Sequence, residues 1–172
     1  MSRRRHRSAA PVRRSPGPGA SVAIDFVAWG AVQAGAGYLT HRLPDRLFAA
    51  DRWLWRERRL EDGGRLYVRR LGIRRWKHWL PDAGAVFAGG MAKRHLGERS
   101  PAHLARFALE TRRTELNHWM ALALAPAFAL WNPPPAMPVI VFYALASNLP
   151  CIAAQRYNRI RLVRVLRSAR SG

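Results

Sequence analysis

The sequence predicts an all-α membrane protein with two to three apolar helices, including a C-terminal helical hairpin, and an Arg-rich interfacial cytoplasmic segment. Residues 136–154 are an uncharged run of 19 residues, close to the ~20 residues that cross a hydrocarbon core. A shorter apolar run ends at Trp131, and the sequence NPPP at 132–135 separates the two runs. The chain has 172 residues with 30 Lys and Arg against 10 Asp and Glu, a formal net charge of +20. The Lys and Arg residues lie outside the apolar runs.

The N-terminal part contains a basic leader and a first apolar run. Residues 1–19 are rich in Arg, Pro and Gly, and we expect them to be disordered. Residues 20–39 are apolar but contain Asp25 and Gln33. This run resembles a signal-like N-terminus with a small-residue cleavage site at 34–36, or it is a retained helix. Retention is preferred, because cleavage would leave a very basic segment outside the cell.

The distribution of positive charge predicts the orientation of the hairpin in the cell membrane. Residues 41–117 hold eighteen Lys and Arg, whereas the Pro-rich tip holds none. Because positive segments stay in the cytoplasm, we expect the tip outside and the basic segments inside, in a multi-pass or hairpin arrangement. The first run either spans, with the basic N-terminus outside, or is re-entrant. We expect residues 20–166 to form a single domain, followed by a tail at 167–172.

The outgoing helix of the hairpin is expected to begin at Ser100, with Ser as N-cap and Pro next. Its apolar part has only 13 residues, roughly 20 Å of helix and too short to cross a bilayer. The turn before it holds Glu115 and His118, and ionisable groups at membrane depth are functional candidates. These two residues are at i and i+3, so the carboxylate can orient the imidazole as a general base requires. In the returning span, Asn148 is expected to hydrogen-bond to another helix.

Three blocks resemble the glycosyl-4,4′-diaponeurosporenoate acyltransferases. They are ETRRTELNHW at 110–119 with the Pro-rich tip after it, YALASNLPCIAAQRYNRIR at 143–161, and YVRRLGIRRWKHWLPDAG at 67–84. The similarity extends from about Tyr38 to Leu166. It implies a membrane enzyme that moves a fatty acyl group onto a sugar hydroxyl of a glycosylated carotenoid, the last step of a carotenoid glycoside pathway. It carries over no catalytic residues.

Acyl transfer to a hydroxyl needs a base, donors for the oxyanion, and two substrates held together. The candidate bases are three His–acid pairs, in order of preference His118 with Glu115, His78 with Asp82, and His41 with Asp45. The first is preferred because a lipid acceptor and a fatty acyl chain would meet there. The second lies next to Arg and Lys residues that suit a phosphate. Each histidine also fits a simpler role as an interfacial anchor.

Polar and charged residues at the ends of the hairpin away from the Pro-rich tip are expected to bind the donor or the sugar. They are Glu110, Arg112, Arg113, Gln155, Arg156, Tyr157, Asn158 and Arg159. Arginine suits phosphates because its guanidinium is planar and always charged. The expected partners are membrane lipids, a glycosylated carotenoid acceptor and an acyl donor, with acyl-coenzyme A as donor and no other cofactor.

Nucleic-acid binding is not expected, since such a protein has no use for an uncharged 19-residue run and no recognised binding motif is present. No metal site is expected, because a single cysteine excludes a four-Cys site. The alternative to an enzyme is a non-catalytic membrane protein that organises a lipid or pigment biosynthesis complex.

Overall fold

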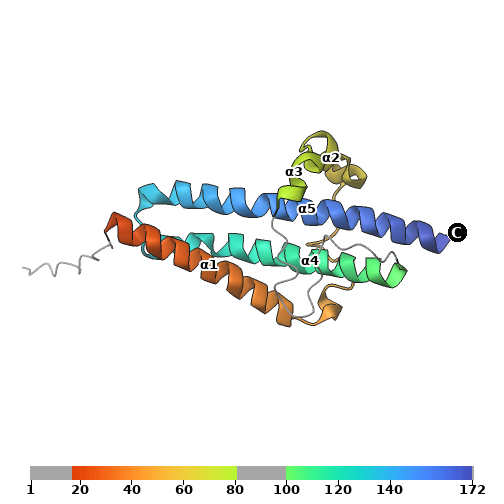
Figure 1. Cartoon of the computed structure of the whole chain (residues 1–172), viewed down its shortest axis with the longest axis horizontal. Helices are drawn as coiled ribbons and strands as arrows, with labels where there is room; N and C mark the ends of the chain where they lie inside the picture. Colours follow the sequence, from red (N-terminus) through yellow and green to blue (C-terminus); the bar gives the residue numbers. More distant parts are fainter. Residues whose placement is uncertain (1–16, 81–99, 172) are drawn as a thin grey trace, which may run out of the picture.

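The computed structural model describes residues 17–80 and 100–171. These residues form helices and connecting loops, and no strand occurs among them. Three long helices lie side by side, and a cluster of short helices is attached to one of them (Figure 1). The long helices are α1 (Pro18–Arg42), α4 (Pro101–Leu124) and α5 (Met137–Ser171). The predicted all-α fold is confirmed.

Helix α1 begins at Pro18, inside the segment that was expected to be a disordered leader. Proline is favoured at the first helical position because its fixed φ suits a helix and its missing N–H costs no bond there. The rest of that leader, residues 1–16, lies outside the described residues. Asp25 accepts a bond from Asn132 at the hairpin tip, and Thr40 accepts one from Arg113 near the middle of α4. The start of α1 therefore lies at the same end of the molecule as the tip.

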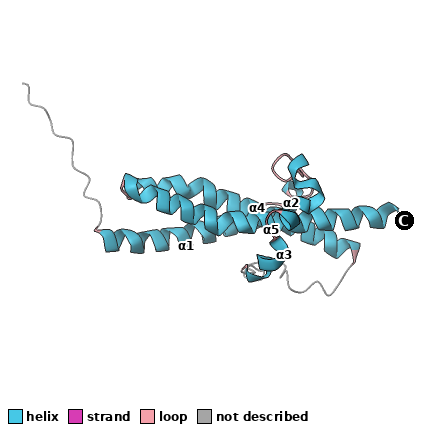
Figure 2. Cartoon of the chain, turned by 90° about the horizontal axis from the view of Figure 1, so that it is seen from above, coloured by secondary structure: helices cyan, strands magenta, loops and turns pink. Residues whose placement is uncertain are grey.

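Helices α4 and α5 form the predicted hairpin and run side by side (Figures 1 and 2). The Ser100 hydroxyl accepts from the backbone N–H of His103 at 3.3 Å, which confirms the N-cap. Two 3₁₀ turns, η5 (Ala125–Leu130) and η6 (Pro134–Ala136), join the helices. Helix α4 ends at Leu124, before the Pro-rich tip, and the consecutive prolines at 133–135 disfavour a continuous helix between η5 and α5.

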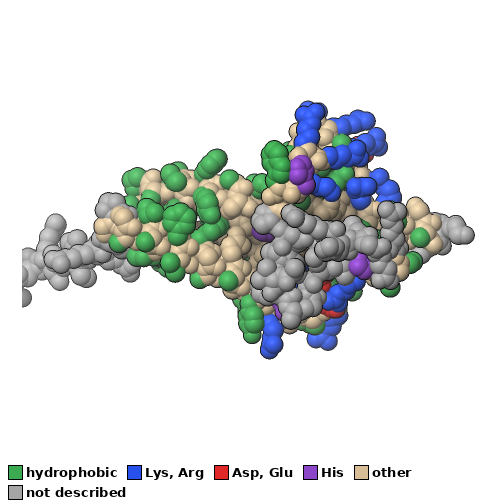
Figure 3. Space-filling view, viewed as in Figure 1, with side chains coloured by type: hydrophobic (Ala, Val, Ile, Leu, Met, Phe, Trp, Pro, Cys, Tyr) green, Lys and Arg blue, Asp and Glu red, His purple; other side chains and the backbone are tan. Residues whose placement is uncertain are grey.

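Two helical stretches are long and apolar enough to cross a membrane, Gly19–Arg42 and Pro134–Ala169. The outgoing helix α4 does not meet this criterion, in keeping with its short apolar part. Figure 3 shows apolar side chains covering the end of the molecule with the tip, and Lys and Arg gathered toward the other half. Exposed large apolar side chains include Phe26, Val27, Val139 and Phe142. A surface of this kind suits lipid rather than water, which fits an all-α membrane protein.

Short helices between α1 and α4 cover the basic half of the hairpin. They are η1 (Asp45–Leu47), η2 (Arg59–Gly64), α2 (Arg65–Arg69), α3 (Ile73–Trp76) and η3 (Lys77–Trp79). Tyr67 and Ile73 pack into a buried cluster with Tyr157 and Ile160 of α5. This contact holds the short helices against the second half of α5. Gly72, the residue before α3, has a φ of 56°, a left-handed conformation that glycine adopts without steric cost.

Candidate active site

Glu115 is fully buried in the layer of charged residues where α4 meets the second half of α5. Arg156 donates to its Oε1 at 2.8 Å, and Arg159 donates to its Oε2 at 2.5 Å. The indole N–H of Trp119 also donates to Oε1, at 3.3 Å. A buried carboxylate is tolerated only when it is paired and hydrogen-bonded, and two guanidinium groups provide both. Glu115 therefore joins α4 to the QRYNR block of α5.

Glu61 of η2 accepts hydrogen bonds from Arg156, whose Nη1 atom donates to Glu115. The Nε and Nη2 atoms of Arg156 donate to the two Glu61 oxygens at 2.8 and 2.9 Å, a bidentate pair. The Tyr67 hydroxyl and the backbone N–H of Arg58 donate to the same carboxylate. Burial alone would raise the pKa of Glu61, but the bonds from Arg156, Tyr67 and Arg58 lower it to about 2. Burial and the bond to Glu61 raise the pKa of Tyr67.

The low pKa of Glu61 predicts that acid weakens the fold. Its ordinary value is 4.5 and its value in the folded protein is about 2. The contribution to stability is therefore complete above about pH 4.5 and is lost as the pH falls toward 2. We expect a loss on the order of 2 kcal/mol. Thermal unfolding in detergent, followed by circular dichroism from pH 7 to 3, measures it.

Glu61→Gln is the variant that isolates this effect. It should unfold at a lower temperature than the parent at pH 7 and lose less stability between pH 5 and 3. An equal loss in both proteins would mean that another carboxylate causes the acid sensitivity.

Arg112 and Arg113 are buried and bonded within the protein. Arg112 donates to Asp51 at 2.7 and 3.0 Å and to the carbonyl oxygen of Phe48 at 3.0 Å. Arg113 donates to Asp45 at 2.5 Å. Both arginines are expected from the sequence to bind donor phosphates. In the structure their partners include the end of α1, the segment that follows it and Glu110. Their geometry supports a structural role.

The other acid and histidine candidates have the following surroundings. Glu110 pairs with Arg106 and Arg113 at 3.2 and 3.3 Å. Asp45, the expected partner of His41, forms ion pairs with the same two arginines. His78 is exposed and contacts the Trp79 ring edge-on, with the ring centroids 5.4 Å apart. Its expected partner, Asp82, lies outside the described residues.

His118 belongs to a polar group that connects all three long helices. Its Nδ1 atom lies 2.9 Å from Oδ1 of Asn148 in α5. Gln33 of α1 donates to the same oxygen at 3.2 Å. The amide nitrogen of Asn148 donates to the carbonyl oxygen of Ala144 at 2.9 Å, which turns the amide oxygen toward His118 and Gln33. The prediction that Asn148 bonds to another helix is confirmed.

The contact with Asn148 favours one tautomer of His118. An amide oxygen only accepts, so the hydrogen of the imidazole is on Nδ1 and the basic nitrogen is Nε2. Sequence reasoning had suggested Glu115 for the orienting role, and the structure shows Asn148 at Nδ1. From the sequence alone, Gln33 is only a polar interruption of an apolar run. A polar residue in a predicted span is itself the signal that could have identified it.

The segment around WKH at 76–78 lies next to QRYNR at 155–159 of α5. Arg74 donates to the Tyr157 hydroxyl at 3.3 Å, and Lys77 donates to the Asn158 amide oxygen at 3.2 Å. Gln155 is buried nearby on α5, and within the described part of the chain its amide oxygen has no hydrogen-bond partner. Among the described residues, no group of three or more His, Cys, Asp or Glu could hold a metal ion.

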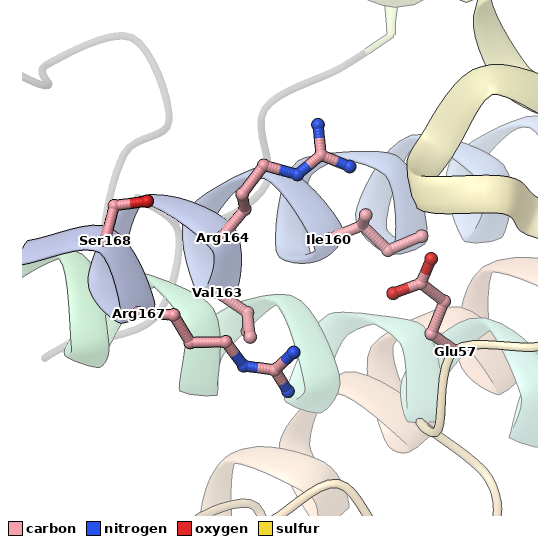
Figure 4. A pocket seen from close by; sticks show the side chains of 6 residues that line it. All are labelled: Glu57, Ile160, Val163, Arg164, Arg167 and Ser168. Atoms are coloured by element: carbon pink, nitrogen blue, oxygen red, sulfur yellow. The ribbon is translucent and has the colours of Figure 1, made fainter. Parts of the chain in front are cut away.

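A hollow of about 340 Å³ lies along the second half of α5 (Figure 4). Its lining combines both signs of charge, because Glu57 from the segment before η2 faces α5 side chains that include Arg164 and Arg167. An adjoining hollow of about 440 Å³ adds Asp51 and Asp62. The carboxylates weaken the attraction of either hollow for an anion.

The family model and the curated relatives that match this chain carry the same description. The sequence model of the family described as glycosyl-4,4'-diaponeurosporenoate acyltransferase matches residues 51–168. Proteins of that name from Staphylococcus aureus strains bovine RF122 / ET3-1, MRSA252 and USA300 are each 31% identical over 140 residues. The match covers 81% of this chain and 84% of each relative. No solved structure matches the chain.

Proposed function

The chain belongs to the glycosyl-4,4'-diaponeurosporenoate acyltransferase family and is an acyltransferase, and we propose that it esterifies a sugar hydroxyl of a glycosylated carotenoid with a fatty acyl group. Acyl-coenzyme A is the proposed donor, and the reaction is the last step of a carotenoid glycoside ester pathway. The observation that carries this proposal is the His118 imidazole, held by Asn148 at the border between the apolar helices and the charged layer.

The placement of His118 suits two lipid-linked substrates. The apolar stretches of α1 and α5 expose large apolar side chains, against which a carotenoid and a fatty acyl chain can lie. The charged layer begins within a turn of His118, with Glu115 and its two arginines. A sugar attached to a membrane-bound carotenoid would therefore reach His118 while its chain remains among lipids.

In the proposed reaction, Nε2 of His118 takes the proton of the sugar hydroxyl as its oxygen attacks the thioester carbonyl. The tetrahedral intermediate then collapses, the C–S bond breaks and the ester C–O bond remains. His118 returns the proton to the departing thiolate, so the products are the ester and free coenzyme A. Asn148 holds Nδ1–H throughout and favours the tautomer that keeps Nε2 basic.

We assign positioning roles to the residues around Glu115. Its bonds to Arg156 and Arg159 fix α4 against α5, which sets the height and rotation of His118. Arg112 and Arg113 fix the segment after α1 in the same way. The proposed contacts with substrate come from the neighbouring block, in which Gln155, Tyr157 and Asn158 can recognise polar groups.

We further propose that the basic half faces the cytoplasm of a cell membrane and that the tip faces outward. The start of α1 is bonded to the tip through Asp25, which supports a retained, spanning α1 with its N-terminal end outside. Residues 20–166 then act as one domain. Lipids, the carotenoid acceptor and the acyl donor are the proposed partners, with no nucleic acid and no metal.

The test of the function is a pigment and glycolipid profile by mass spectrometry. Cells that make a glycosylated carotenoid acid are compared with the gene deleted and with it restored. We expect the deletion to accumulate a pigment that lacks one fatty acyl ester and the restored strain to recover the ester. An unchanged profile would contradict the proposed substrate and leave the alternative of a non-catalytic organising protein, against which the names of the relatives argue.

A further inference from the structure

Three cationic side chains gather around Tyr157. Arg74 donates to its hydroxyl at 3.3 Å, while the charged ends of Lys77 and Arg161 lie 5.2 and 5.7 Å from its ring centroid. Lys77 also donates to Asn158 at 3.2 Å. Within residues 17–80 and 100–171, none of these three cations forms an ion pair with a carboxylate.

Such a cluster is unfavourable without an anion. Burial lowers the pKa of Lys77, and the charges of Arg161 and Arg74 lower it further, against the opposing effect of Tyr157. Like charges held close together repel, and a bound anion removes the repulsion. Arg74 and Arg161 are exposed and Lys77 is half-buried, so an anion from the surrounding water can reach them.

The other positive regions are less suited to an anion. The four arginines that sequence reasoning assigned to phosphate each pair with a carboxylate inside the protein: Arg112, Arg113, Arg156 and Arg159. The hollow of Figure 4 contains Glu57, and the adjoining one contains further acids. Around Tyr157, by contrast, three cations converge and no described carboxylate forms an ion pair with them.

We propose that Arg74, Lys77 and Arg161 bind the phosphate groups of the acyl donor, with help from the Asn158 amide. This rests on the proposed function, because it takes the donor to be an acyl-coenzyme A. The head group of an anionic phospholipid has the same chemistry and is the other source that must be tested.

The cation cluster and the proposed base lie at different heights along α5. Tyr157 is nine residues after Asn148, which corresponds to roughly 14 Å along the axis and about half a turn around it. Gln155, seven residues after Asn148, lies on nearly the same face of α5 as Asn148 and between the two heights. The buried amide oxygen of Gln155 accepts no bond in the described part of the chain, and the pantetheine arm of coenzyme A carries amide N–H groups that could supply one.

The test compares two donors with the purified, full-length protein. One is a long-chain acyl-coenzyme A, and the other is the N-acetylcysteamine thioester of the same fatty acid, which carries no phosphate. The variant is Lys77→Gln combined with Arg74→Gln. The control is Arg46→Gln, which removes an exposed positive charge from η1, outside the cluster around Tyr157.

We expect the double variant to raise KM for acyl-coenzyme A about tenfold or more, since it removes two charged donors. The kcat of the double variant with acyl-coenzyme A should match that of the parent, and so should its kcat/KM for the N-acetylcysteamine thioester. Arg46→Gln should match the parent in kcat and KM with both donors. Equal losses with both donors would indicate a structural role and overturn the proposal. Unchanged KM for acyl-coenzyme A would overturn it as well.

Direct binding separates this inference from the proposed reaction. Titration with coenzyme A, followed calorimetrically, should show binding to the parent and to Arg46→Gln and about tenfold weaker binding to the double variant. That result supports the phosphate site even if the parent transfers no acyl group. If the double variant instead keeps its affinity for coenzyme A and loses affinity for phosphatidylglycerol vesicles, the site binds lipid and the donor assignment is wrong.

Discussion

Replacing His118 by alanine is expected to lower kcat for acyl transfer by about 10²–10⁴-fold, the usual contribution of a general base. The imidazole is the group that takes the proton of the sugar hydroxyl, and alanine has no substitute for it. The side chain is partly buried, and the ion pairs of Glu115 with Arg156 and Arg159, which join α4 to α5, do not depend on it, so the variant should still fold. Turnover by purified protein with matched thermal unfolding curves is the measurement.

Two other variants show whether His118 acts in the proposed way. His78→Ala removes the second candidate base, which is exposed, and should leave kcat within about twofold. If His78→Ala abolishes turnover and His118→Ala does not, the base is His78. Asn148→Asp places a carboxylate at Nδ1, which stabilises the imidazolium. The acidic limb of its pH–rate profile should therefore move to higher pH, a change that a purely structural role of Asn148 would not produce.

The hairpin could be predicted from local sequence alone. Three prolines after Asn132 predict a turn between two apolar runs, and the uncharged run that follows them is of spanning length. The structure places the end of α4 earlier, at Leu124, with a 3₁₀ stretch before the prolines. The polar group at His118 was partly predictable for the same reason, because Asn148 interrupts an apolar span and needs a partner. Both predictions succeed because the sequence next to these residues restricts their backbone conformation or requires a hydrogen-bond partner.

The partners of the arginines could not be predicted in this way. The sequence contains 30 basic and 10 acidic residues, so most arginines have no carboxylate nearby and many pairings satisfy the same pattern. The bond between Arg156 and Glu61 joins residues 95 positions apart. It depends on how the short helices dock on α5, and that docking follows from the packing of Tyr67 and Ile73 against Tyr157.

Replacing Glu115 by alanine is expected to destabilise the protein by about 3–5 kcal/mol, because it leaves buried arginines without a counter-charge. Arg159 is 3% exposed and Glu115 is 0% exposed, so water cannot take the place of the lost carboxylate. Thermal or chemical unfolding in detergent is the measurement. Asp62→Asn is the matched control, because asparagine also tolerates the left-handed φ of 47° at this position. The ion pair of Asp62 with Arg65 is more than half exposed on both sides, and pairs of that kind contribute about 0–1 kcal/mol.

Glu115→Gln then separates the two roles that a carboxylate beside His118 can have. Glutamine keeps the shape and an acceptor oxygen for one arginine but removes the charge, so stability should fall. If Glu115 only positions the helices, kcat per folded molecule should stay within about threefold of the parent, and the pH–rate profile should not move. A profile shifted to lower pH would show that the charge of Glu115 supports the protonated imidazole directly. In that case Glu115 would share with Asn148 the task of tuning the base.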